Sequence, residues 1–446
     1  MRTPIYDFVS DYIAKDPLRL HMPGHKGMAI LGCEARDITE IGGADVLYSA
    51  DGIIAESEAN AASLFGTRRT LYSTEGSSLV IRAMLCLLKT YAASIGRPAR
   101  ILAARNAHRS FMYAAALLDL EVDWLSPGEG AELLSLGMSP EEIAAAIDGQ
   151  SERPLALYLT APDYLGNLPD LRPIAEICHR RGILLFVDNA HGAYLRFLSQ
   201  SRHPISLGAD LCADSAHKTL PVLTGGAYLH VSPSAPDFFT DSAAHALSLF
   251  ASSSPSYLIL QSLDLANRYL ADGYREKLDA FCKRLSALKA RLREAGFSLV
   301  GDEALKMTIL TKPFGYGGDE MAAYLEACGI VPEFYDPDYL TLMLTPEQGE
   351  AAVNALETAL LSLPRRESID SLPPLLPRAR RLLSIREALF SPFEEIPLEA
   401  AKGRILSSAS IACPPAIPIC ICGEEIDERA LRCFSYWGVS RVRVCM

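Results

Sequence analysis

Three stretches of this sequence end an apolar run with polar side chains of the kinds that take part in catalysis. ILLFVDNAHG delivers Asp188, DSAHK delivers Lys218 thirty residues later, and ARNAHRS places His108 after an earlier apolar run. A lysine in a water-poor cleft can form an imine with an aldehyde. A carboxylate can hold a heterocyclic nitrogen in its protonated form. Together these residue types would suit covalent chemistry on a nitrogen heterocycle that bears an aldehyde group.

Pyridoxal 5′-phosphate (PLP) has both groups, and its ring accepts electrons best when its nitrogen is protonated. Lys218 would hold the aldehyde as a Schiff base, Asp188 would face the ring nitrogen, and His108 could stack on the ring. Ser77 and Ser78, in STEGSS, begin a predicted apolar helix. Hydroxyls, backbone N–H groups and the helix dipole favour a phosphate there.

Each of these residues also has an ordinary structural interpretation. A lysine taken alone is most often a solvated surface residue. Asp188 could cap a turn or helix, and Ser77 and Ser78 could simply begin a helix. His108 could be a hydrogen-bonded loop histidine. The cofactor hypothesis therefore depends on all of these features falling at one edge of the fold.

Alternating strands and helices between residues 99 and 232 predict the scaffold that would bring these residues together. Strands are expected at 99–105, 155–162 and 183–190, then in DLCADSAHK and GGAYLHV, with helices in RSFMYAAALLD and PIAEICHRRG. Apolar strands such as ILLFV, interleaved with helices, indicate a mostly parallel sheet covered on both faces. Ligands of such sheets gather at the carboxyl ends of the strands, where Asp188 and Lys218 fall.

The remaining segments suggest a further domain. Helices are expected at 4–14, within GIIAESEANAASLFG and SSLVIRAMLCLLKTYAAS, and over a long stretch broken near Gly273. The Pro-rich LPRRESIDSLPPLLPRARR is an expected loop or boundary. We therefore expect an N-terminal segment (1–35), a large PLP-binding α/β domain (36–294) and a smaller α+β C-terminal domain (295–446).

Composition narrows the classes of function. The 446 residues are 49% hydrophobic and 22% charged, a globular profile, and the net charge of −12 disfavours nucleic acid or an anionic membrane as partner. Eleven cysteines without a framework spacing favour a reducing cytoplasm. Neither a signal peptide nor an uninterrupted apolar run of membrane-spanning length is found in the sequence.

Two groups of potential metal ligands fail on spacing, so no metal is expected. His21 and His25 lie in HMPGH, where Pro and Gly prevent a helical ligand pair. Cys413, Cys420 and Cys422 lack a fourth ligand at a suitable spacing, and the alternation in PICICG predicts a strand.

Eight short motifs, in order along nearly the whole chain, give the sequence a specific resemblance. They are HMPGHKG, DITE, STEGSS, RNAHRS, VDNAHGA, SAHKTLPVLTGGAYLH, SSSPSYLILQSLD and CPPAIPICICGEEI. In these motifs the chain resembles the ornithine/lysine/arginine decarboxylase family of fold-type-I PLP enzymes. Its length resembles that of the short members.

The resemblance implies roles for individual residues. The matching positions are Lys218 for the Schiff base, Asp188 for the pyridine nitrogen, His108 for ring stacking, Ala190 under the ring, Ser77, Ser78 and Ser215 for the phosphate, His217 before the lysine, and Ser253 for a phosphate contact from the neighbouring subunit. A shared active site implies a homodimer. Glu424 is a weaker candidate for the distal cation of the substrate, and it could instead cap a helix beginning near Ile426.

Some positions depart from the family pattern. Position 189 is Asn where many members have Glu, position 225 is Gly where members often have Gln, and Arg109 replaces Lys. The PLP-binding positions remain intact, while the substrate and the level of activity are left open. The function predicted is decarboxylation of arginine, lysine or ornithine to an amine of polyamine metabolism. The alternatives are another PLP reaction, as in an aminotransferase or lyase, and a PLP-binding homologue without turnover.

Overall fold

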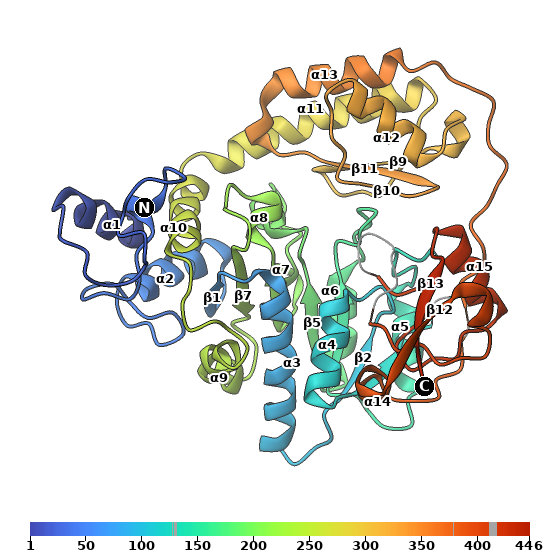
Figure 1. Cartoon of the computed structure of the whole chain (residues 1–446), viewed down its shortest axis with the longest axis horizontal. Coiled ribbons are helices and arrows are strands. Elements are labelled where there is room, and N and C mark those ends of the chain that lie inside the picture. Colours follow the sequence, from blue (N-terminus) through green and yellow to red (C-terminus); the bar gives the residue numbers. More distant parts are fainter. Residues whose placement is uncertain (127, 129–131, 378, 410–416) are drawn as a thin grey trace. The chain divides into compact units, whose positions relative to one another are not determined.

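The computed structural model describes the chain except residues 127, 129–131, 378 and 410–416 (Figure 1). The chain forms two compact units, each built from several segments. The first unit comprises residues 1–99, 155–157 and 171–277, and the second comprises 100–154, 158–170 and 278–446. These units do not follow the expected boundaries at residues 35 and 294, so the three-domain division remains a prediction.

A seven-stranded sheet carries the strand ends singled out above, in the order β1-β7-β6-β5-β4-β2-β3. β5 and β6 are parallel, as are β2 and β3, whereas β7 is antiparallel to both β1 and β6. The strands are β1 (Arg69–Ser73), β2 (Arg100–Ala103), β3 (Glu121–Trp124), β4 (Ala156–Thr160), β5 (Leu184–Asp188), β6 (Leu211–Asp214) and β7 (Ala227–Val231). The predicted α/β class and sheet are confirmed.

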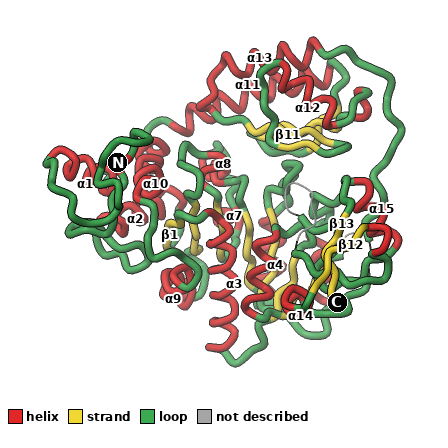
Figure 2. The backbone as a smooth tube through the Cα atoms, viewed as in Figure 1, coloured by secondary structure: helices red, strands yellow, loops and turns green. Residues whose placement is uncertain are grey.

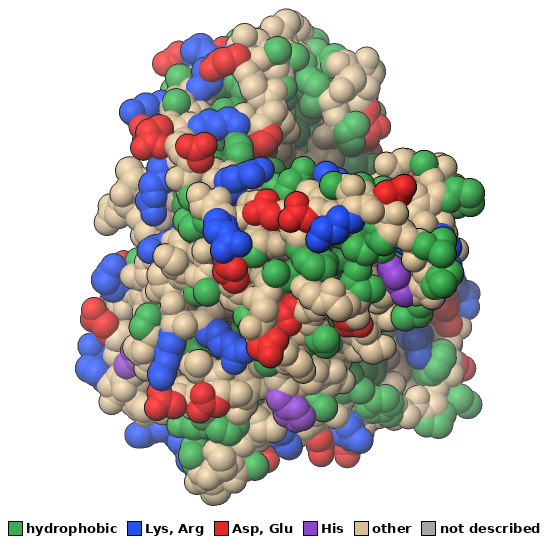
Figure 3. Space-filling model, turned by 90° about the vertical axis from the view of Figure 1, so that its left-hand side faces the viewer, with side chains coloured by type: hydrophobic (Ala, Val, Ile, Leu, Met, Phe, Trp, Pro, Cys, Tyr) green, Lys and Arg blue, Asp and Glu red, His purple; other side chains and the backbone are tan. Residues whose placement is uncertain are grey.

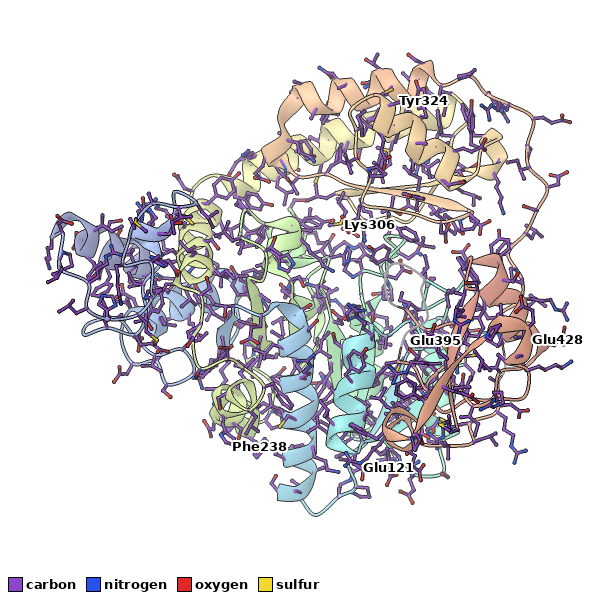
Figure 4. The ribbon with its side chains drawn as sticks, in the orientation of Figure 1. Glu121, Phe238, Lys306, Tyr324, Glu395 and Glu428 are labelled. Carbon is purple, nitrogen blue, oxygen red and sulfur yellow. The ribbon has the colours of Figure 1, made fainter. Side chains whose placement is uncertain are left out.

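Helices of the first unit pack on its strands. Tyr91 of α3 packs against Phe238 and Phe239 of α9, with ring centroids 5.4 and 4.9 Å apart. Phe238 is labelled in Figure 4. The helices of this unit are α1 (Pro4–Ala14), α2 (Ile53–Phe65), α3 (Gly76–Ser94), α6 (Leu171–Arg180), α7 (Pro204–Leu207), α8 (Ala216–Thr219), α9 (Asp237–Ser248) and α10 (Tyr257–Ala271). Between α1 and α2 the chain is almost entirely loop (Figure 2).

The second unit has two further sheets. One is four-stranded and antiparallel, in the order β10-β11-β9-β8, and the other pairs β12 with β13. On β9, Lys306 forms a fully buried ion pair of 2.9 Å with Glu303 (Figure 4). The strands are β8 (Ser298–Val300), β9 (Lys306–Leu310), β10 (Phe334–Tyr335), β11 (Tyr339–Met343), β12 (Phe393–Pro397) and β13 (Arg441–Cys445).

Helices α4 and α5 accompany the sheet strands of the second unit, and the others belong to its C-terminal part. They are α4 (Arg109–Leu118), α5 (Pro140–Asp148), α11 (Tyr274–Glu294), which begins at the end of the first unit, α12 (Gly318–Ala327), α13 (Gly349–Ser362), α14 (Ile385–Phe390) and α15 (Glu428–Tyr436). The predicted break near Gly273 is confirmed, because α10 ends at Ala271 and α11 begins at Tyr274. None of the described helices is long and apolar enough to cross a lipid bilayer.

The strand expected in PICICG is absent from the structure. Residues 418–423 form bends and a turn and are all buried, so the alternation of residue types does not create one buried and one exposed face. Gly423 has a φ of +94°, and the Glu424 N–H donates to the Ile421 carbonyl at 3.0 Å. A turn closed in this way cannot continue as an extended strand.

Candidate active site

Asp188 ends β5 as a buried carboxylate. Its side chain belongs to a residue that is only 2% exposed, and the N–H of Ala190 donates to its Oδ1 at 3.1 Å. β5 lies parallel to β6, with Asp188 opposite Ala213. The carboxylate is thus held at the carboxyl end of the sheet, where it can accept a hydrogen bond from a protonated ring nitrogen.

Lys218 lies on α8, immediately after β6, and contacts a residue that follows β5. Its Nζ is 3.0 Å from Nε2 of His191, a residue that is 5% exposed. At this distance one of the two nitrogens donates a hydrogen bond to the other. No role was expected for His191, although VDNAHGA places it three residues after Asp188. The contact brings the two strand ends together around the lysine amine.

Ser77 and Ser215 meet although 138 residues separate them. The Ser215 hydroxyl donates to the Ser77 Oγ at 2.7 Å. Ser77 and Ser78 lie in the first turn of α3, a helix of 19 residues. The hydroxyls and the positive end of a long helix therefore form a group that suits a phosphate.

His217 anchors the turn that carries Lys218. Its Nδ1 donates to the Gly226 carbonyl at 2.9 Å, and its backbone N–H donates to the same oxygen at 3.2 Å. Since a carbonyl only accepts, the Nδ1 atom must carry the ring proton. Burial lowers the pKa of His217, so the ring is neutral near pH 7. A direct catalytic role for His217 remains a prediction.

Gly225 explains one departure from the family pattern. Its φ is +101°, and a Cβ at this position would lie 2.7 Å from the Thr74 carbonyl oxygen. The Gly225 carbonyl also accepts the Gly76 N–H at 2.7 Å, at the start of α3. A side chain here would push against the turn that presents Ser77, so this backbone requires glycine.

Ser253 lies in an exposed loop before α10. The neighbouring Ser252 N–H donates to Oε1 of Glu75 at 2.7 Å, which places this loop beside the start of α3 in the same chain. Donation of Ser253 to a partner subunit remains a prediction.

His108 belongs to the second unit and caps α4. Its Nδ1 accepts the Ser110 N–H at 3.2 Å and contacts the Ser110 hydroxyl at 2.9 Å. Its ring is half-buried. Capping accounts for one edge of the ring, and stacking on a cofactor remains a prediction.

Glu424, in the same unit, forms an ion pair with an arginine. Arg105 donates to both of its carboxylate oxygens, at 2.7 and 2.9 Å, and the Ile421 N–H donates to Oε2 at 2.8 Å. Burial alone would lower the pKa of Arg105, but the bonds to Glu424 raise it. The alternative that Glu424 caps the next helix is wrong, because α15 begins at Glu428 and Asp427 accepts the Ala430 N–H.

The rejected metal ligands have other surroundings in the structure. His21 Nε2 lies 2.7 Å from the Tyr12 hydroxyl, and His25 Nε2 lies 3.2 Å from Asp37 Oδ2. Burial raises the pKa of both Cys420 and Cys422, which keeps these thiols protonated. Cys413 lies outside the described residues.

Similarity to known proteins identifies the family. Residues 3–302 match the model described as Orn/Lys/Arg decarboxylase, major domain. The chain belongs to the Orn/Lys/Arg decarboxylase family. It is 30% identical to the protein YaaO of Bacillus subtilis (97% of this chain, 93% of that protein), and 30% identical to the arginine decarboxylase of the same organism (96% and 91%).

Solved structures confirm the fold. The constitutive lysine decarboxylase of E. coli superposes with a TM-score of 0.76 over 100% of this chain and 82% of that one, at 17% identity. At this identity the likeness shows the fold alone. Family and fold together make this chain a PLP-dependent decarboxylase of basic amino acids.

The residues of the first unit fit PLP. Lys218 supplies an amine for the aldehyde, Asp188 supplies a buried carboxylate for the ring nitrogen, and Ser77 and Ser215 supply hydroxyls at a helix N-terminus for the phosphate. The aldehyde, the ring nitrogen and the phosphate of PLP thus each have a matching group in one compact unit.

Proposed function

We propose that this enzyme decarboxylates L-arginine, using PLP bound as a Schiff base to Lys218. The observation that carries the residue assignment is the meeting of Lys218 and His191 beside Asp188, at the end of adjacent parallel strands. Arginine is the first candidate because the curated relatives that match nearly the whole chain include arginine decarboxylases, at 26–30% identity.

The chain's own residues divide the work of binding. When bound, PLP supplies an electron sink for the pair of electrons left when CO2 departs. Asp188 would keep the ring nitrogen protonated, and the small side chain of Ala190 would leave room for the ring. Ser77, with Ser78 and Ser215, holds the phosphate. These contacts orient the cofactor while Lys218 fixes its aldehyde carbon.

Two assigned residues lie in the second unit. His108 is proposed to stack on the cofactor ring, as its match to the family's ring-stacking histidine implies. Glu424 is the earlier candidate for the guanidinium or ammonium of the substrate. A substrate cation at Glu424 would compete with the bidentate bond from Arg105, which supports a structural role for this pair.

We also propose a homodimer in the cytoplasm, with Ser253 contributing to the partner's phosphate site. The loop between α1 and η1 (Glu34–Arg36) exposes several large apolar side chains, a pattern typical of protein interfaces. These are Leu18, Leu20, Met22, Met28, Ile30 and Leu31. On the face shown in Figure 3, hydrophobic side chains lie between mixed charges. The described cysteines are free thiols, which supports a reducing compartment.

One experiment tests the cofactor assignment and the substrate together. The purified enzyme should show the visible absorption band of a lysine Schiff base, and borohydride should trap PLP on the peptide containing Lys218. Lys218→Ala should lose the band, the adduct and the release of CO2 from arginine, whereas the surface variant Lys402→Ala should keep all three. A borohydride-stable adduct in Lys218→Ala would refute the lysine assignment.

The substrate is measured by CO2 release and amine identification with arginine, lysine, ornithine and a neutral amino acid. Production of a keto acid in place of CO2 would instead support transamination. Decarboxylation of the neutral amino acid as fast as arginine would refute a basic substrate and leave the PLP assignment intact.

A further inference from the structure

A second carboxylate lies beside the Asp188 turn, and the roles proposed above do not use it. Asp214 ends β6 and has no exposed surface. The Asn189 side-chain amide donates to its Oδ1 at 2.7 Å, and the Cys212 thiol donates to the same oxygen at 3.3 Å. Asn189 is the residue between Asp188 and Ala190, so Asp214 holds the turn that presents the proposed ring-nitrogen partner.

Two buried histidines donate to the other oxygen of Asp214. The Nε2 atoms of His203 and His230 lie 3.0 and 3.2 Å from Oδ2, and neither side chain is exposed. Nδ1 of His203 accepts the Ile205 N–H at 3.3 Å, which requires the ring proton to be on Nε2. Nδ1 of His230 is bonded to the Thr70 hydroxyl at 2.8 Å.

The protonation states make Asp214 the charged centre of this cluster. Burial by itself would raise its pKa, but the two histidines hold that pKa well below its usual range. Burial lowers the pKa of His230, which keeps that ring neutral. An ionised carboxylate without access to water must be satisfied by fixed donors, so loss of any one of them is costly.

The cluster connects the segment that carries Ser215 and Lys218 with the turn that carries Asp188. Asp214 is followed directly by Ser215 and, four residues on, by Lys218. On the other strand, the Asn189 N–H donates to the Ala213 carbonyl at 2.9 Å. Asn189 is also packed tightly, because a Cβ added to Gly192 would lie 1.9 Å from its Oδ1.

We propose that Asp214 is a positioning residue: its bond to Asn189 sets the geometry of Asp188, and its place directly before Ser215 sets that of Lys218. This inference rests on the PLP-binding roles proposed for those two residues. The histidines act as hydrogen-bond donors to Asp214, and the amide of Asn189 transmits the position of the carboxylate to the Asp188 turn.

Asp214→Asn tests this positioning role because an amide at position 214 turns an N–H₂ group toward either Asn189 or the histidine donors. We expect the dissociation constant for PLP binding to the apoprotein to rise at least about tenfold. The Schiff-base band should shift or broaden. In the apoprotein, amide hydrogen exchange should accelerate at residues 189–192 and 215–219, a readout that needs no cofactor.

The double variant N189D/D214N provides the matched rescue. The amide at position 214 can then donate to a carboxylate at position 189 while its oxygen still accepts both Nε2 protons. PLP affinity should return to within about threefold of the natural protein. Thr70→Val, which removes the bond to His230 and a bond to the Thr67 hydroxyl, should lower thermal stability without changing PLP affinity.

Several results would overturn the proposal. One is Asp214→Asn with unchanged PLP affinity and unchanged exchange, and another is a double variant no better than the single one. If Asp214→Asn does not fold, Asn189→Ala, which removes only the link to the turn, must itself weaken PLP binding. A stoichiometric metal ion bound by His203, Asp214 and His230 would also refute the proposal, because both Nε2 atoms would then bind the ion and could not donate to the carboxylate.

A failure of this proposal differs from a failure of the proposed function. If the natural enzyme binds no PLP, or if Lys218→Ala keeps the borohydride adduct, the cofactor roles themselves are wrong. If the natural enzyme binds PLP at Lys218 and the Asp214 variants behave like it, only the positioning role is wrong.

Discussion

Strands β5 and β6 have an aspartate–histidine interaction at each end, and the two ends differ in their access to water. At the amino end, Asp210 accepts hydrogen bonds from His179 Nε2 at 3.0 Å and from the Leu185 N–H at 2.7 Å. The His179 side chain is 40% exposed there. At the carboxyl end, Asp214 accepts from His203 and His230, all of them without exposure.

The difference shows how one pair of residue types serves two purposes. Water can replace the histidine at the exposed end, so that interaction contributes little to stability. At the buried end no water can take the place of a lost donor, and the cost falls on the whole cluster. Since ligands bind at the carboxyl ends of such strands, only the buried cluster of Asp214 and its two histidines can affect the chemistry.

The largest effect is expected at the carboxyl end itself. Asp188→Asn removes the charge that keeps the ring nitrogen protonated, so kcat should fall on the order of a hundredfold or more. Asp210→Asn, at the other end of the same strands, should leave kcat near that of the natural enzyme. Steady-state decarboxylation rates of the two variants test this contrast, and equal losses of kcat would contradict it.

Glu424 extends the comparison to a buried carboxylate with a charged partner. Arg105→Met leaves Glu424 buried without its bidentate partner, which should destabilise the protein by about 3–5 kcal/mol. The double variant R105M/E424L removes both charges and should recover most of that loss. Thermal unfolding measures both variants.

Glu424→Gln separates the structural role from substrate binding. If the carboxylate serves mainly Arg105, the variant loses stability while its preference among basic amino acids stays the same. A fall in kcat/KM of roughly ten- to a hundredfold with unchanged stability would instead restore Glu424 as the contact for the substrate cation.

A smaller effect is expected from crowding the Asn189 turn. In Gly192→Ala the new Cβ would lie 1.9 Å from Asn189 Oδ1, so the amide must move. We expect a loss of about 1–3 kcal/mol in stability, with weaker PLP binding. Gly42→Ala is the matched control, because nothing lies within 4 Å of a Cβ there. If both variants bind PLP equally well, the Asn189 amide is not needed to hold the turn.

Local sequence patterns predicted much of the scaffold. Apolar runs such as ILLFV located β5, and the residues that follow the runs located Asp188 and Lys218 at strand ends. The alternating pattern failed to predict the structure of PICICG, because its odd-numbered and even-numbered residues are all buried and a turn at Gly423 ends the segment. Periodicity indicates a strand only where one face is solvated or the run is continuous.

Long-range partners could not be read from the sequence. Arg105 and Glu424 are 319 residues apart, and no local pattern couples them. His230 becomes a partner of Asp214 only when β6 and β7 pair, and His203 reaches the same carboxylate from the start of α7. His191 did stand in a recognised motif, and its short spacing from Asp188 was the one available signal.

The smallest effect is expected at the exposed end, where it should depend on pH. The hydrogen bond to Asp210 raises the pKa of His179 above its ordinary 6.5, against the opposing effect of partial burial. A raised folded-state pKa means that the folded protein binds the proton more tightly than the unfolded chain. The stabilisation is therefore fully present below about pH 6.5 and is lost as the pH rises through the folded-state pKa. Because the ring is partly exposed to solvent, we expect His179→Gln to cost less than about 1 kcal/mol at pH 5.5 and almost nothing at pH 8.5. Thermal unfolding at the two pH values measures the difference, and PLP affinity should be the same in both proteins. A His179→Gln variant that loses PLP at either pH would show that the two ends of the strands are coupled, and the contrast drawn between them would be wrong.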